Sequence, residues 1–328
     1  MPYPFKLDLA RQRVLRIEMD EAAFRAASFL DERILTPATQ GGWVPMQDFL
    51  QPAAAPQPVL PLHFIFHTGH VGSTLVSRLL DEAARVLPLR EPLPLRTLAG
   101  MHDALPEAPA PGSRELFDGL LAALLREWQR GFAATEAVIV KATSSAARIA
   151  PALLDAAPRA RAIYLDLRAE PWLATLLAGE NSPIDLNGHA PERLRRLIAQ
   201  RGSSTAMPAT PSLGELAAMS WLAETTTRRA VLARYPQRVL AIDFDEFLAD
   251  VPAHLRTILS HFGLPADPGF LAGVQRSPVL TRYSKAPEHP YDPALRAAVL
   301  HDSRQRNREE ILKGLRLLDR LEAATAAS

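Results

Sequence analysis

The sequence predicts an α/β fold in which a central, mostly parallel sheet lies between layers of helices. Short apolar runs at 63–66, 137–140 and 161–167 have the length and composition of buried strands. Longer amphipathic stretches separate these runs, and strands joined by such helical crossovers usually run parallel. Hydrophobic residues make up 48% of the 328 residues, which is ample for a core covering both faces of a sheet.

The first 60 residues are predicted to form an N-terminal extension, and residues 61–328 a single domain. Within the extension, 13–18 has the pattern of a short strand and 21–34 that of a helix. Four prolines between 51 and 61 indicate a linker.

In the remaining chain, strand and helix patterns alternate. A second strand starts at Leu87 and ends at Glu91-Pro92, because proline cannot continue a central ladder. The further strands are expected at 137–140, 161–167 and 238–244. Helices are expected at 114–130, 146–157, from 172, and at 191–201, 213–235, 252–262, 291–301 and 303–324. Loops are expected at 103–113, 202–211 and 278–291, and residues 181–213 form either a lid over a pocket or a surface insertion.

The stretch 62–80 has the features of a phosphate-binding cradle. An apolar strand breaks into a turn that contains Gly69 and Gly72, and a helical pattern follows. Glycines let the backbone approach an anion, and the free N–H groups and dipole of the first helical turn attract it. Ser73 and Thr74 cap the helix and offer hydroxyl groups. The structural alternative is an ordinary strand–turn–helix corner.

The common nucleotide-kinase form of such a loop, G-x-x-x-x-G-K-[ST], has a lysine directly before the hydroxyl residue. The cradle lacks this lysine, because Gly72 stands directly before Ser73. The segment His70-Val71-Gly72-Ser73-Thr74 instead resembles the loop of sulfotransferases, in which a basic residue precedes Ser-Gly-Thr-Thr. Val71 stands in place of a serine, and His70 in place of lysine or arginine. The resemblance implies that Thr68 to Thr74 bind the 5′-phosphosulfate of 3′-phosphoadenosine 5′-phosphosulfate (PAPS), whose desulfated form is adenosine 3′,5′-bisphosphate (PAP).

Three further stretches, in the family's order, support the resemblance. Residues 138–141 resemble its strand that ends in lysine, 158–171 its strand that ends in Arg-Asp-Pro, and 238–265 its last strand and following helix. The resemblance implies a P-loop fold and assigns Arg168 to the 3′-phosphate of PAPS. The serine that family members place eight residues later is Leu176 here, with Thr175 one position earlier.

Two residues are candidates for the chemistry of transfer. A glutamate at the position of Glu91 is the general base in tyrosylprotein sulfotransferases, and an attacking alcohol must lose its proton to such a group. The alternative is a structural carboxylate that pairs with Arg90 or Arg96. Lys141, at a predicted strand end, can neutralise the leaving phosphate oxygen. The alternative is a surface lysine.

Other basic residues are assigned more loosely. His70 is a candidate cation beside the phosphosulfate, and Ser284 and Lys285 resemble the family's basic loop that closes over the cofactor. Exposed loop charge is the alternative for both. Arg193, Arg195, Arg196 and Arg201 are expected to form a solvated helix face. No metal is expected, because His67 and His70 have no third ligand nearby in the sequence.

Composition narrows the classes of partner. The net charge of +1 argues against a nucleic-acid-binding protein. There is no cysteine, and no apolar run is long enough for a membrane span. We expect a cytoplasmic protein of bacterial type, because the charged N-terminus does not resemble a signal peptide.

The predicted function is transfer of a sulfuryl group from PAPS to a hydroxyl or amine of a small-molecule, carbohydrate or peptide acceptor. Two alternatives remain at this level. One is a nucleoside triphosphate-dependent kinase, and the other is a degenerate member that binds a nucleotide, or nothing, and acts through a partner.

Overall fold

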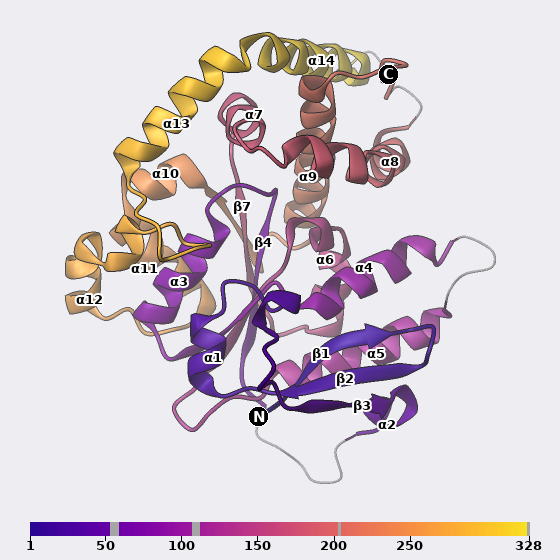
Figure 1. Ribbon diagram of the computed structural model, residues 1–328, viewed down its shortest axis with the longest axis vertical. Coiled ribbons are helices and arrows are strands. Elements are labelled where there is room, and N and C mark those ends of the chain that lie inside the picture. Colours follow the sequence, from indigo (N-terminus) through magenta and orange to yellow (C-terminus); the bar gives the residue numbers. More distant parts are fainter. Residues whose placement is uncertain (53–58, 107–111, 203–204, 327–328) are drawn as a thin grey trace.

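The computed structural model describes residues 1–52, 59–106, 112–202 and 205–326 (Figure 1). Parts of the loops predicted at 51–61, 103–113 and 202–211 therefore lie outside the described residues. None of the helices in these ranges combines the length and the apolarity needed to cross a bilayer.

A five-stranded parallel sheet forms the centre of the molecule, and its strand order is β5-β6-β4-β7-β8. The strands are β4 (Leu62–His67), β5 (Val86–Arg90), β6 (Ala137–Lys141), β7 (Ala162–Asp166) and β8 (Val239–Asp243). All four pairings are parallel. Each strand is an apolar run, as expected for a sheet whose two faces are both covered by other elements. The predicted strands and their parallel arrangement are confirmed.

Side chains alternate between two apolar cores, one on each face of the sheet. Phe64 and Phe66 of β4 belong to the core shared with the N-terminal sheet and α5, whereas Ile65 belongs to the core formed with α3, α9 and α11. This period of two along β4 produces the three layers of the fold. The helices around the sheet are α3 (Ser73–Ala83), α4 (Leu93–Ala104), α5 (Arg114–Trp128), α6 (Ala150–Ala156), α7 (Ala169–Leu177), α8 (Ser182–Arg201), α9 (Leu213–Arg234), α10 (Phe244–Ala249), α11 (Val251–Phe262) and α12 (Pro268–Gly273).

The chain closes with helices that lie across one end of the molecule. They are α13 (Pro293–Arg306) and α14 (Arg308–Ala326), the yellow elements of Figure 1. Short 3₁₀ turns are η1 (Glu32–Ile34), η2 (Ser144–Ile149), η3 (Val274–Arg276) and η4 (Pro278–Thr281). Helix α14 packs on α9 and α7, which lie on the side of the sheet that carries α3.

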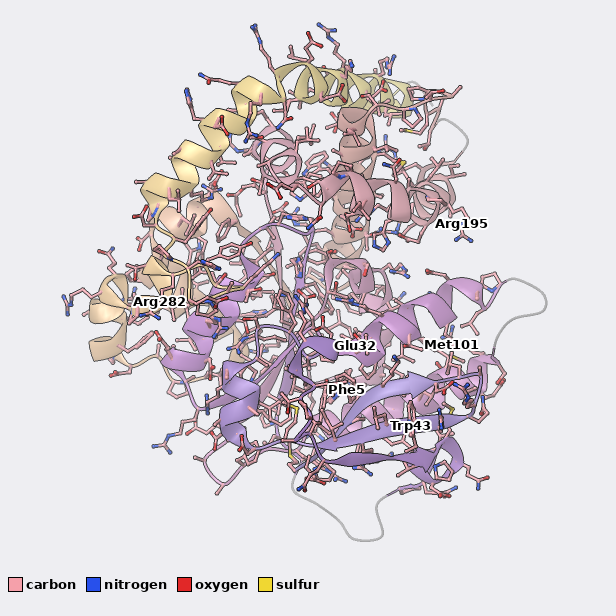
Figure 2. All side chains as sticks on the ribbon, in the orientation of Figure 1. Phe5, Glu32, Trp43, Met101, Arg195 and Arg282 are labelled. Atoms are coloured by element: carbon pink, nitrogen blue, oxygen red, sulfur yellow. The ribbon has the colours of Figure 1, made fainter. Side chains whose placement is uncertain are left out.

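The N-terminal extension folds into a three-stranded antiparallel sheet. Its elements are β1 (Pro2–Asp8), β2 (Arg13–Glu18), α1 (Glu21–Ala26), β3 (Gly41–Pro45) and α2 (Met46–Leu50). Phe5 is fully buried in the core shared with the central sheet, whereas Trp43 is partly exposed on β3 beneath the guanidinium of Arg13 (Figure 2). The strand predicted at 13–18 is confirmed, and β1 and β3 were not predicted.

The helix predicted over 21–34 is wrong beyond Ala26. The backbone turns there, and the N–H of Leu30 donates to the carbonyl of Arg90 at 2.7 Å. The carbonyl of Leu30 accepts from the N–H of Leu93 at 3.1 Å. The helical spacing of apolar residues holds to Leu30, but these bonds to the end of β5 replace the helical ones. The segment 27–33 is thereby held against the central sheet.

The insertion predicted at 181–213 contains a regular helix, α8. Two of its arginines contradict the predicted solvated face, because they point into the protein. Arg193 is 8% exposed and donates to Ser220 Oγ of α9 at 3.2 Å. Arg196 binds both Glu224 and Thr227 of α9. Glu224 is buried, so the charge of Arg196 compensates a carboxylate that would otherwise be costly to bury.

Candidate functional site

The loop between β4 and α3 leaves a row of backbone donors free. Gly69 and Gly72 have φ angles of +88° and +65°, which glycine adopts without strain. The N–H of Gly69 is bonded, but the backbone N–H groups from His70 to Leu75 have no partner among the described residues. They lie at the N-terminus of an 11-residue helix, whose dipole favours an anion there. The predicted cradle therefore has the backbone geometry of an anion site.

Two hydroxyl groups at the cradle support the same interpretation. Thr68 Oγ1 and Thr74 Oγ1 are buried and have no hydrogen-bond partner within the described residues. An unpaired buried hydroxyl costs free energy, so such atoms call for a ligand or water. The neighbouring Ser73 is also buried. These groups fit a phosphosulfate, whose oxygens accept hydrogen bonds.

Gly72 is required for packing as well as for its conformation. A Cβ atom at this position would lie 2.0 Å from ring atoms of Phe244, the first residue of α10. A side chain at 72 would thus collide with the core beside the loop.

The first bend of the cradle is held by two buried side chains, which we call the loop clamp: His67 and Trp172. His67 Nδ1 accepts from the N–H of Gly69 at 3.1 Å, and its Nε2 lies 2.9 Å from the carbonyl oxygen of Ala142. The imidazole is therefore neutral with its proton on Nε2. Trp172 Nε1 of α7 donates to the carbonyl of Gly69 at 2.7 Å. The clamp joins the cradle to β6 and α7, the elements that carry Lys141 and follow Arg168.

Glu91 and Lys141 meet at the carboxyl edge of the sheet. Arg90 and Lys141 are partners in the parallel register of β5 and β6, and the N–H of Glu91 donates to the carbonyl of Lys141 at 2.7 Å. The ammonium of Lys141 forms an ion pair with Glu91 Oε1. Lys141 is fully buried and Glu91 is 8% exposed. The alternative of a surface lysine is excluded, and both groups reach the same point.

The electrostatics of this pair keep Glu91 ionised. Burial by itself raises the pKa of Glu91, but the nearby Lys141 ammonium outweighs burial and lowers that pKa to about 2. Burial lowers the pKa of Lys141, and Glu91 opposes that shift. His67 is also affected, since burial and then the Lys141 charge lower its pKa to about 3. A neutral His67 agrees with its hydrogen bonds.

Arg168 lies where the sequence predicts, two residues beyond β7. It is exposed at the N-cap of α7, and its side chain has no recorded partner among the described residues. The preceding carbonyl, that of Leu167, accepts from Trp221 Nε1 of α9 at 2.9 Å. The backbone at Arg168 is therefore fixed while its guanidinium is available.

The segment with Ser284 and Lys285 comes close to the cradle. The carbonyl of Ser284 accepts from Arg78 Nε of α3 at 2.8 Å. Lys285 is exposed, and its charge helps to lower the pKa of His70. The structure thus brings this predicted loop to the site.

His70 differs from its predicted electrostatic role. The surrounding protein and the charge of Lys285 lower its pKa to about 4, although part of the residue reaches solvent. Its ring therefore carries no charge near pH 7, so the expected weak cation is replaced by a neutral imidazole. It lies edge-on to Trp172, with ring centroids 6.4 Å apart.

The sequence did not indicate five residues that the structure adds to the site. Phe29, Asp31 and Arg33 come from the N-terminal extension, whereas His67 and Trp172 form the loop clamp. Arg96 was named only as a possible partner of Glu91, and its guanidinium lies 3.6 Å from Glu91 Oε2. The signal that could have indicated Trp172 is its position, since it is an aromatic residue with a hydrogen-bond donor directly after Glu170-Pro171.

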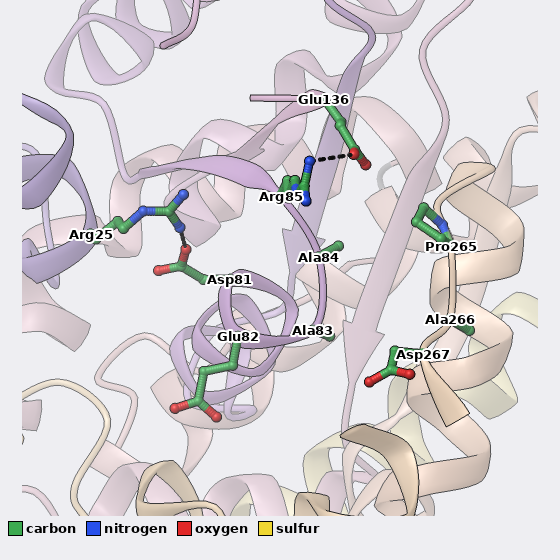
Figure 3. Close-up of a pocket in the computed structure, with 10 residues that line it drawn as sticks. All are labelled: Arg25, Asp81, Glu82, Ala83, Ala84, Arg85, Glu136, Pro265, Ala266 and Asp267. Atoms are coloured by element: carbon green, nitrogen blue, oxygen red, sulfur yellow. Dashed lines mark hydrogen bonds and ion pairs between the residues drawn. The ribbon is translucent and has the colours of Figure 1, made fainter. Parts of the chain in front are cut away.

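An open cleft of about 630 Å³ lies elsewhere, at the carboxyl-terminal end of α3 (Figure 3). Its charged residues include the ion pairs Arg25–Asp81 and Arg85–Glu136. None of the candidate site residues lines it. We therefore place the candidate site at the cradle and not at this cleft. In the described part of the chain, no group of three or more acidic or histidine side chains is arranged to hold a metal ion.

The chain was also compared with known proteins. No family model and no curated protein matches it. Solved structures do match. The structures it resembles include sulfotransferases.

Three of these structures show the range of the sulfotransferase likeness. A sulfotransferase domain from the curacin biosynthetic pathway is 13% identical, with 81% of this chain and 99% of that chain covered and a TM-score of 0.41. Sulfotransferase STF9 from Mycobacterium avium is 15% identical, with 76% and 77% covered and a TM-score of 0.43. Mouse sulfotransferase SULT7A1 complexed with PAP is 12% identical, with 82% and 89% covered and a TM-score of 0.39.

Proposed function

We propose that this protein is a PAPS-dependent sulfotransferase acting on a hydroxyl or amine. The observation that supports it best is that the unpaired backbone N–H groups of the cradle and the buried Glu91–Lys141 pair lie at the same edge of the sheet. A donor bound in the cradle is then adjacent to a cation, and a carboxylate lies beside that cation.

The residues divide between the two ends of the donor. The N–H groups of the cradle and the hydroxyls of Thr68 and Thr74 would bind the phosphosulfate end. Arg168 would bind the 3′-phosphate, for which a planar guanidinium is well suited. Lys285 adds a second cation near the cradle. His70 contributes hydrogen bonding without charge.

In the reaction, the acceptor oxygen or nitrogen forms a bond to sulfur while the bond between sulfur and the phosphate oxygen breaks. PAP leaves with the electron pair of that bond, and Lys141 neutralises the developing charge. The proton of the acceptor passes to Glu91. Most of the rate enhancement would come from holding the groups in line, as in phosphoryl transfer.

The ion pair makes Glu91 a weak base, because its pKa is about 2. Lys141 is the cause of this shift, so any interaction that draws the ammonium toward an anionic donor restores basicity to Glu91. We therefore expect Glu91 to become an effective base only when the cradle is occupied. This couples donor binding to acceptor activation.

Binding tests the donor assignment. PAP should raise the melting temperature and bind by calorimetry, since a ligand that binds only the folded state stabilises it. Arg168→Ala should weaken PAP by tenfold or more, about 1.4 kcal/mol, and leave adenosine 5′-phosphate nearly unchanged, because only PAP carries a 3′-phosphate. Stabilisation by ATP with Mg²⁺ and not by PAP would favour a kinase instead.

Turnover tests the catalytic assignment and separates an enzyme from a degenerate binder. Glu91→Gln and Lys141→Ala should each lower the rate of sulfuryl transfer by roughly 10²-fold. PAP affinity should not weaken in Glu91→Gln, because the substitution removes the carboxylate that competes with the donor for Lys141. A wild-type protein that binds PAP but transfers to no acceptor in a broad screen would support the degenerate binder.

A further inference from the structure

The acceptor side of Glu91 is bordered by the N-terminal extension. Leu30 bonds through its backbone to Arg90 and Leu93, on either side of Glu91. Glu91 itself has a φ of +56°, so its direction is imposed by this turn. The segment 29–33 and the first turn of α4 therefore border Glu91 on this side.

An aromatic ring forms part of this border. Phe29 is half-buried, with its ring centre 5.9 Å from Lys141 Nζ and 3.6 Å from the guanidinium carbon of Arg33. The same ring thus lies near both the Lys141 ammonium and an exposed guanidinium.

At this border the acidic side chains are buried and the arginine side chains are exposed. The side chains of Asp31 and Glu91 are only 7% and 10% exposed, whereas those of Arg33 and Arg96 are 58% and 44% exposed. The exposed acid of the segment, Glu32, pairs with Lys6 at 3.3 Å (its position is labelled in Figure 2). An approaching molecule therefore meets positive charge first.

The two arginines differ in how firmly they are held. Arg33 grips Asp31 through two nitrogens, at 2.7 and 2.5 Å. Arg96 forms only long ion pairs, since its Nη2 lies 3.9 Å from Asp31 Oδ2 and 3.6 Å from Glu91 Oε2. Its side chain makes no hydrogen bond within the described residues. Its N–H donors are available, whereas those of Arg33 are partly used.

We propose that Arg96 binds a carboxylate of the acceptor, so that the preferred acceptors are hydroxy acids. Guanidinium binds carboxylate through two parallel hydrogen bonds, and this geometry is stronger than a point-charge attraction. The acceptor hydroxyl then lies beside Glu91, next to the anchored carboxylate. This inference rests on the proposed function, since it takes Glu91 as the end of the acceptor path.

The test compares matched acceptors that differ only in charge. The pairs are 3-hydroxybenzoate and 3-hydroxybenzamide, 4-hydroxyphenylacetate and its amide, and glucuronate and glucuronamide. Transfer is followed by release of PAP at saturating PAPS. The wild-type protein should have a kcat/KM at least tenfold higher for a carboxylate member than for its neutral partner. Arg96→Gln should remove most of this preference by raising KM for the carboxylate, and Arg96→Lys should restore it only in part.

Arg114→Gln is the control, because it removes one exposed arginine from α5, where the partner is Asp118. It should leave the preference unchanged. Equal or better activity with the neutral members, or an equal loss for both members in Arg96→Gln, would overturn the inference. If no member reacts, the panel is tested for binding to PAP-loaded protein by thermal shift, and carboxylates that fail to bind also overturn it. PAP binding itself is measured separately, so failure here is distinct from failure of the proposed function.

Discussion

At the scale of single residues, Gly72 joins the conformation of the cradle to the core behind it. Its φ of +65° lies in the region that side-chain-bearing residues rarely adopt, and a Cβ would meet the ring of Phe244 at 2.0 Å. Two costs therefore add at one position. One is strain in the backbone, and the other is overpacking against a buried ring.

Replacing Gly72 by alanine should destabilise the protein by about 2–4 kcal/mol, from about 1 kcal/mol of strain and about 1–3 kcal/mol of overpacking. Urea denaturation measures this loss. In a Phe244→Ala background the same substitution should cost only the strain, because the ring is gone. Gly100→Ala is the control, since a Cβ there meets nothing within 4 Å and α4 gains a better helix former. Equal costs in both backgrounds would show that Phe244 is not the obstacle.

The Glu91–Lys141 pair shows how one residue sets the chemistry of another. The ammonium holds the carboxylate ionised in a place where burial alone would favour its neutral form. Removing only one partner leaves an unpaired buried charge, which is costly. Buried charge of this kind is more easily explained by chemistry than by stability.

At the scale of elements, two tryptophans fix the backbone at the two ends of the proposed donor site. Trp172 of α7 holds the carbonyl of Gly69 in the cradle. Trp221 of α9 holds the carbonyl of Leu167, next to Arg168. Each indole N–H donates to a backbone carbonyl, one at the cradle and one beside Arg168. The two tryptophans are therefore a matched pair for mutagenesis.

Trp172→Phe should weaken PAP and adenosine 5′-phosphate by the same factor, about tenfold, because it releases the cradle that both ligands use. Trp221→Phe should weaken PAP more than adenosine 5′-phosphate, because it releases the backbone that positions Arg168. Calorimetry with both ligands gives the two ratios. Identical ratios in the two variants would contradict the division of the site into a cradle end and a 3′-phosphate end.

Helix α8 shows why an amphipathic pattern can mislead. Its arginines follow one another closely in the sequence and resemble a solvated face, yet Arg193 and Arg196 bind partners on α9. Those partners, Ser220 and Glu224, lie on a different helix and leave no mark on the local pattern. Helix α4 was not predicted, although Pro92 and Pro94 stand at its start, where proline is tolerated.

At the scale of the whole molecule, several buried groups make stability depend on pH. Burial lowers the pKa of His63 to about 4 and of His67 to about 3. The unfolded chain takes up protons on these histidines below about pH 6.5, whereas the folded chain does not. The stability that they provide is therefore lost as the pH falls from about 6.5.

Asp166 acts in the opposite direction. Burial, and after it the nearby Asp243 against the opposing Arg228, raises its pKa to about 6. Its contribution is fully present below its ordinary pKa of 3.8 and is lost as the pH rises through about 6. Between pH 4 and 6 it therefore offsets about one of the two histidines.

The free energy of unfolding should fall on acidification from pH 6.5 to 4, because unfolding then takes up a net of about one proton, or about 1.4 kcal/mol per pH unit at the steepest. Asp166→Asn should steepen this fall, because the offset disappears. Urea denaturation at a series of pH values measures both slopes. A fall that is unchanged in Asp166→Asn would contradict the raised pKa, and a flat profile would contradict the buried neutral histidines.

The sequence by itself determined the layered α/β fold and the cradle, because both depend on local patterns. Apolar runs of strand length, the helices between them and the glycines before Ser73 are all neighbours in the chain. The places of Glu91, Lys141 and Arg168 at or just beyond strand ends also followed, since the carboxyl ends of parallel strands meet at one edge of a sheet. The boundary between the extension and the main domain near residue 60 stays a prediction.

Only the tertiary structure decided how the site is completed. The adjacency of β5 and β6 brings Glu91 onto Lys141 although 50 residues separate them, and no local pattern specifies strand order. The turn after Ala26 brings Phe29 and Arg33 to the same edge, against the helical spacing of that segment. The neutral state of His70 likewise depends on the protein packed around it. Interactions between distant segments set these features, because burial and charge act through space and not along the chain.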